Sequence, residues 1–160
     1  MGLMYSVEFE ATAVATASGD VDFFEIVPGD DAPVLIHAIY LSQSSDVGDA
    51  AEEMLRVKII RLPATVTSGT GGAAATPVPL NVRYPAASAA CEVLNTAVAT
   101  TSGTAVDIHS DTFNIRAGWV YLPTPEMRPR VAQAEGIVVR LMAAVTDELT
   151  MSGTLYMEEL

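Results

Sequence analysis

Apolar and polar side chains alternate from residue 5 to residue 16 of the chain. Tyr5, Val7 and Phe9 fall on one side of this alternation, polar residues fall mainly on the other, and Val14 breaks the pattern. A period of two residues is that of a β-strand with one buried face. The pattern therefore predicts an N-terminal strand whose outward face holds Val14.

The same period returns along the rest of the chain, between clusters of Gly, Pro, Ser and Asp. These clusters favour turns, because Gly and Pro suit turn dihedral angles and Asp side chains bond the turn backbone. A corner is expected at Asp111. Further strands are predicted at residues 21–27, 34–41, 54–62, 93–99, 105–109, 113–122, 137–142 and 149–157.

The patterns of two of these segments also predict which of their faces are buried. Residues 34–41 are apolar on both faces, which is typical of a central strand with both faces covered. In residues 54–62, every second side chain from Leu55 is apolar and points inward. Ile60 belongs to the other set, so we expect Ile60 to point outward.

Many short strands with no helical periodicity indicate an all-β protein. We expect a single domain over residues 1–160, an antiparallel β-sandwich of the jelly-roll type with about eight or nine strands. Half of the residues are apolar, enough for a core between two sheets. Residues 63–79, rich in Gly, Ala and Pro, predict a long mobile surface loop, either a contact element or a solvated insertion.

The charge balance limits the choice of partners. The net charge is −12, with Lys58 as the one lysine, so the chain would repel a phosphate backbone or an anionic bilayer. We therefore expect neither nucleic acid nor a membrane as a partner. The lone Cys91 cannot form an internal disulfide, which fits a buried thiol in a protein made in a reducing cytoplasm.

Residues able to carry catalysis are few. His109 and Asp111, two apart on a strand, could supply two metal ligands, but a site needs three or four. His37 lies among apolar residues and is expected to be a core or interface histidine. No Gly-x-Ser-x-Gly sequence is present, and the Glu158–Glu159 pair is typical of solvated charge. We expect no catalytic residues, no metal and no cofactor, and therefore expect that the protein is not an enzyme.

A resemblance to a known group of proteins is carried mainly by the C-terminal third. The matching segments are Phe113-Asn114-Ile115, residues 119–126, Arg128-Pro129, residues 136–141 and residues 152–155, together with residues 39–46 and 54–57. In these segments the chain resembles small, acidic, all-β proteins encoded among virion genes of tailed bacteriophages. It is similar in kind to the jelly-roll decoration, or cement, proteins of their capsids.

The resemblance implies a structural role on a virus particle. Such a subunit is made in the cytoplasm of the bacterial host, binds the outer surface of the icosahedral head and ties neighbouring capsomers together. Its partners would be the major capsid protein and itself, as a homotrimer. Two alternatives stay open: a receptor- or glycan-binding fibre, spike or tail module of the same virion, and a cupin-like or hydrolytic enzyme.

A subunit of this kind needs broad contact area in place of a deep pocket. The N-terminal strand, the loop at residues 63–79 and the Pro-rich crossing at residues 123–129 are candidate extended arms. Apolar residues left outside the sandwich would be buried in a threefold contact. The candidate interface residues are Met4, Tyr5, Val7, Val14, Ile60, Tyr84, Trp119, Arg128 and Arg130.

Overall fold

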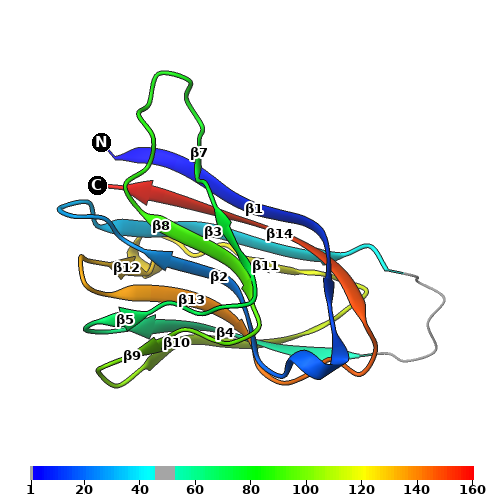
Figure 1. Ribbon diagram of the computed structural model, residues 1–160. Coiled ribbons are helices and arrows are strands. Elements are labelled where there is room, and N and C mark those ends of the chain that lie inside the picture. Colours follow the sequence, from blue (N-terminus) through cyan, green and yellow to red (C-terminus); the bar gives the residue numbers. More distant parts are fainter. Residues whose placement is uncertain (1, 46–52) are drawn as a thin grey trace.

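Antiparallel β-strands make up most of the protein in a computed structural model, which describes residues 2–45 and 53–160 (Figure 1). Among these residues, fourteen strands form two six-stranded sheets and one two-stranded ribbon. Eight of the strands are six or more residues long. The predicted all-β antiparallel sandwich is confirmed, while its jelly-roll connectivity stays a prediction.

Sheet A has the strand order β11-β3-β14-β1-β7, and β12 also pairs with β3. The predicted strand at residues 34–41 is central as expected, because β3 pairs with β14 on one side and with β11 and β12 on the other. The strands of sheet A are β1 (Leu3–Val14), β3 (Val34–Gln43), β7 (Val78–Pro79), β11 (Trp119–Tyr121), β12 (Arg130–Val131) and β14 (Leu149–Glu159).

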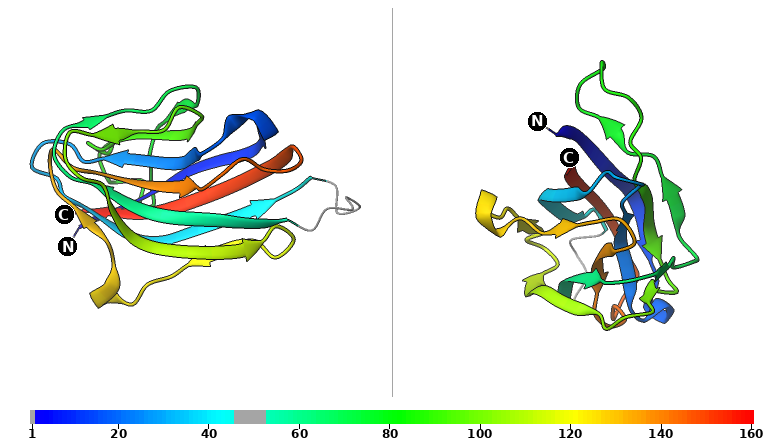
Figure 2. Two further views of the ribbon diagram at one scale, coloured as in Figure 1. Left: turned by 90° about the horizontal axis from the view of Figure 1, so that it is seen from below. Right: turned by 90° about the vertical axis from the view of Figure 1, so that its left-hand side faces the viewer.

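Sheet B faces sheet A across the core and has the order β10-β4-β13-β2-β8-β6 (Figure 2). Two 3-10 turns, η1 (Thr16–Ser18) and η2 (Pro125–Met127), lie in connections. In the part of the chain that the structure describes, no helix is long and apolar enough to cross a membrane. The strands of sheet B are β2 (Val21–Val27), β4 (Met54–Leu62), β6 (Ala73–Ala75), β8 (Ala90–Asn95), β10 (Val106–Asn114) and β13 (Gly136–Leu141), and the ribbon is β5 (Val66–Thr67) with β9 (Thr100–Thr101).

The core forms from the inward residues of both sheets. Alternation places every second residue of β14 inward, and its inward and half-buried positions alternate along the whole strand. Aromatic rings of the two sheets meet in the middle, where the Phe9 and Phe24 ring centroids are 5.3 Å apart. The largest fully buried side chains are Tyr5, Phe23, Phe24, Ile26, Ile36, Ile39, Ile59, Leu62, Ile137, Leu141, Met151 and Leu155.

A β-bulge in β1 overturns the prediction for Val14. The register against β14 shifts between Phe9 and Thr12, and Ala11 there has a φ of 46°. One extra residue reverses which side chains point inward. Val14 therefore faces the core opposite Leu149 and is 3% exposed, so the prediction that it lies outside is wrong.

Ile60 and Trp119 are also buried within the chain, at 4% and 5% exposure. Ile60 points out of sheet B as predicted, but it is covered there and packs in a second cluster with Leu62, Ala99 and Val138. Trp119 joins the main core. The prediction that these two side chains stay accessible outside the sandwich is wrong. Connecting segments cover Ile60 on the outward side of sheet B, whereas Trp119 packs into the main core.

The predicted corner at Asp111 is wrong as well, since β10 runs through it without interruption. The turn comes later, where Ala117 N–H bonds the Asn114 carbonyl and Gly118 takes a φ of 70°. A Cβ at Gly118 would lie 2.8 Å from the Leu41 carbonyl oxygen. This turn lets β11 cross to sheet A.

Residues 63–79 do not form the unpaired loop that their composition predicts. The segment contains β5, β6 and β7, and Thr70 makes a further bridge to Ala97. A Cβ at Gly72 would lie 2.1 Å from the Val93 carbonyl oxygen, so the segment lies directly on the backbone of β8. Gly72 has no side chain, and this allows the close approach.

Candidate functional site

Each histidine contacts a carboxylate. His37 Nε2 lies 2.7 Å from Glu158 Oε2, and His109 Nε2 lies 3.9 Å from Asp111 Oδ2. Within residues 2–45 and 53–160, no group of three or more His, Cys, Asp or Glu residues could hold a metal ion. Burial, followed by the charges of nearby glutamates, raises the pKa of Cys91 to about 12, so this thiol stays protonated at neutral pH.

The predicted His109 and Asp111 pair belongs to an aromatic cluster between β10 and β11. The His109 and Tyr121 ring centroids are 4.8 Å apart, and Trp119 stacks on Tyr121 at 6.0 Å. Trp119 Nε1 donates a hydrogen bond of 2.9 Å to Asp111 Oδ2. This bond is the main cause that lowers the pKa of Asp111. The cluster joins an edge of sheet A to an edge of sheet B.

Trp119 is the one tryptophan of the chain, so its fluorescence should report the protonation of Asp111. Because the folded-state pKa is lowered, the stability from the ionised carboxylate is present above pH 3.8 and is lost as pH falls through the lower pKa. We therefore expect an emission change centred below pH 3.8. Asp111→Asn should remove it, and circular dichroism should exclude unfolding as the cause. A change centred above that pH would contradict the assignment.

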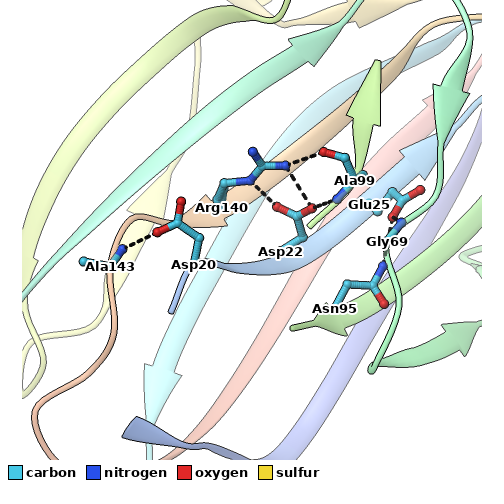
Figure 3. A network of polar contacts seen from close by, with 8 residues as sticks. All are labelled: Asp20, Asp22, Glu25, Gly69, Asn95, Ala99, Arg140 and Ala143. Carbon is cyan, nitrogen blue, oxygen red and sulfur yellow. Dashed lines mark hydrogen bonds and ion pairs between the residues drawn. The ribbon is translucent and has the colours of Figure 1, made fainter. Parts of the chain in front are cut away.

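A buried ion pair lies on the outer face of sheet B (Figure 3). Arg140 Nε donates a 2.6 Å bond to Asp22 Oδ1, and the Ala99 amide donates a 2.7 Å bond to Asp22 Oδ2. Arg140 also donates to the Ala99 carbonyl oxygen at 2.9 Å. Burial raises the pKa of Asp22, and the contacts with Arg140 oppose that rise. The pair holds the segment before β9 against the sheet.

A second buried carboxylate holds the segment that contains β5 and β6 (Figure 3). Glu25, 2% exposed, accepts a 3.0 Å bond from the Gly69 amide and a 2.9 Å bond from Asn95 Nδ2. These contacts join the covering segment to β2 and β8. Together with the Asp22 pair they show why much of the outer face of sheet B is covered by the chain itself.

The outer face of sheet A is more open. Register places Val120, Tyr40, Thr154 and Glu8 in one row across four strands. Tyr40 is 40% exposed and Val120 is 58% exposed. Tyr156 packs edge-on against Tyr40, with ring centroids 6.1 Å apart.

Two of the predicted interface residues lie on this same face, at opposite ends of one row. A parallel row contains Arg130, Leu35, Glu158 and Met4, one residue from each of four strands. Met4 is half-buried and Arg130 is exposed. Three further residues of this face were not predicted from the sequence: Tyr40, Val120 and Tyr156. Tyr40 was missed because both faces of its strand are apolar, which predicts that both are covered.

The other predicted residues are scattered. Tyr5 and Val7 are 0% and 1% exposed, and β1 lies between β14 and β7, so the prediction that this strand is an extended arm is wrong. Tyr84 is half-buried in the loop after β7, and Arg128 is half-buried in the Pro-rich crossing. Their roles in an interface stay predictions.

The chain matches no protein-family model, no curated protein and no solved structure.

Proposed function

We propose that this protein is a structural subunit of a tailed-bacteriophage particle, a decoration or cement protein. It binds the major capsid protein on the outer surface of the icosahedral head and stabilises contacts between capsomers. It acts as a homotrimer and is made in the cytoplasm of the bacterial host. The observation that carries this proposal is the outer face of sheet A, and the resemblance to phage virion proteins supplies the identity of the partner.

The composition of this face fits a protein partner. One row holds Tyr40 and Val120 in the open, with Tyr156 half-buried beside Tyr40, and Met4 lies half-buried in the parallel row, although the whole chain has a net charge of −12. Cores of protein interfaces are enriched in Tyr, Met and Arg, which this face carries, while the exposed Glu8 stands at the β1 end of the Tyr40 row. A sheet face also offers broad area, which binding to a shell of subunits requires.

Tyr40→Glu should weaken binding to undecorated shells by about tenfold or more, because a charge would be buried without a partner in the contact. The matched control is Val106→Glu on β10, since Val106 is 41% exposed and Tyr40 is 40% exposed. Binding is measured by co-sedimentation with shells, and occupancy by electron microscopy. Equal binding by the two variants would contradict the assignment of this face.

Raising the salt concentration should leave the affinity of this protein for undecorated shells almost unchanged, or increase it. Apolar burial contributes about 25 cal/mol per Å² and is not weakened by salt, which screens charges over roughly 10 Å at 0.1 M. Co-sedimentation from low to moderately high salt tests this. A steep loss of binding would mean that Arg128 and Arg130 anchor the protein electrostatically, contrary to the proposal.

A second candidate function is a receptor- or glycan-binding module of a fibre, spike or tail. The observation that favours it is the aromatic cluster, where Tyr121 and His109 are partly exposed beside the Asp111 carboxylate. An aromatic ring next to a few polar groups is a common ligand-binding arrangement. Electron microscopy of particles separates the two functions, because a decoration protein adds density over the head and a fibre or tail module adds it at a vertex or the tail.

A further inference from the structure

A short arm at residues 80–88 follows β7 and projects from the body of the sandwich (Figure 1). Its tip is a tight turn in which the Tyr84 amide donates to the Asn81 carbonyl oxygen at 2.9 Å. Val82, inside this turn, is 98% exposed. Turns favour Gly, Pro, Asn, Asp and Ser at such positions, so a large apolar residue here has no role in the turn itself.

The arm is held in place at its base. The Tyr5 hydroxyl donates a 3.1 Å bond to the Pro85 carbonyl oxygen. Glu159 Oε1 accepts bonds from the Ser88 and Ala89 amides, at 2.9 and 2.8 Å. Because these contacts order the arm in advance, docking its tip would cost little conformational entropy.

A groove of about 630 Å³ lies between β1 and β6, where the two sheets meet along one side. In the described ladders, β7 covers the edge of β1 at Tyr5 and Ser6, and the groove begins beyond them. One wall consists of Gly and Ala residues, whose small side chains leave the space open. The groove is lined by Phe9, Val93 and Leu94, by residues 71–76, and by Glu8 and Glu10 among others.

We propose that the arm of one copy inserts into this groove of a second copy, with Val82 against the apolar lining and Arg83 beside Glu8 and Glu10. Charge complementarity selects this occupant. Two copies with a net charge of −12 repel each other, so a contact between them needs a cation placed against an acidic rim. Arg83 stands exposed at the arm tip, and Glu8 and Glu10 are exposed beside the groove.

The arm and the groove are different surfaces, so the contact is head-to-tail. A head-to-tail contact closes into a ring when the rotation between copies allows it, and three copies would give the homotrimer proposed above. This inference goes beyond the proposed function, because it requires no shell and does not involve Tyr40 or Val120, although Glu8, at the β1 end of their row, also borders the groove.

A charge exchange tests the contact in solution. Arg83→Glu and Glu10→Arg should each raise the dissociation constant of self-association about tenfold, and the double variant should recover most of the loss. Sedimentation velocity at low salt measures the association. All four proteins should have equal melting temperatures, because both residues are exposed. A double variant that associates no better than the singles would overturn the pairing.

Cross-linking tests the head-to-tail geometry. Thr12 also lines the groove, so a mixture of Val82→Cys and Thr12→Cys chains should form covalent dimers under mild oxidation, whereas neither variant alone should do so. Few disulfides should form through Cys91, because this thiol is buried and burial raises its pKa to about 12. Efficient cross-linking of Val82→Cys alone would show a tip-to-tip contact and overturn the inference. A wild-type chain that stays monomeric at high micromolar concentration would overturn it too, while Tyr40→Glu would still test shell binding separately.

Discussion

Asp22→Ala is expected to lower the free energy of unfolding by about 3–5 kcal/mol. The carboxylate is 0% exposed, and its removal leaves the Arg140 guanidinium, with a 13% exposed side chain, without its counter-ion. The Ala99 amide also loses its acceptor. Breaking a buried ion pair from one side is costly because the remaining charge stays out of water. Urea unfolding followed by circular dichroism measures the change.

The matched control is Asp107→Ala. Asp107 also pairs with a cation, Lys58 Nζ at 2.5 Å, but the two side chains are 51% and 31% exposed. Water and salt screen such a pair, so its loss should cost about 0–1 kcal/mol. Similar costs for the two variants would show that the Asp22 pair does not hold the covering segment.

Gly72→Ala is expected to cost about 2–3 kcal/mol, because a single methyl group has no space there. A Cβ at this position would lie 2.1 Å from the Val93 carbonyl oxygen and 2.6 Å from the Leu94 carbonyl carbon. Both are backbone atoms, which cannot rotate away as a side chain can. The segment around Gly72 must therefore move off β8. Urea unfolding gives the cost, and hydrogen exchange of the β8 amides should become faster.

Gly19→Ala provides the comparison for this prediction. Gly19 has a φ of 66° and nothing within 4 Å of an added Cβ, so the cost there is backbone strain alone, about 1 kcal/mol. If Gly72→Ala costs no more than Gly19→Ala, then the close contact with β8 does not stabilise the fold.

Strand positions could be predicted where alternation ran between clear turn clusters. The predicted segments 21–27 and 54–62 coincide with β2 and β4. Inward and outward faces were less predictable, because a single inserted residue at the β1 bulge reverses them for Val14. Ile60 points outward as predicted, yet a segment distant in sequence packs over it. The alternation of residues within a strand does not indicate whether another segment covers its outward face.

The segment at residues 63–79 was misread for a different reason. A sequence pattern predicts packing from the side chains it contains. Gly69 and Gly72 have no side chain, and for that reason they can lie directly against the backbone of β8 and of the residues that follow it. The candidate surface was found in part: Met4 and Arg130 lie on it. Tyr40 and Val120 were not found, because an exposed apolar residue and a buried one look alike in a strand pattern.

The cover over sheet B gives the two outer faces of the sandwich unequal freedom to change during evolution. Ile60, Val138 and the Asp22 pair are constrained by folding itself, since the chain's own segments rest on them. Tyr40 and Val120 on sheet A lie under no such segment, being 40% and 58% exposed. Substitutions at Tyr40 and Val120 should therefore change the surface of the domain at a smaller cost in folding stability than substitutions at Ile60 or Val138.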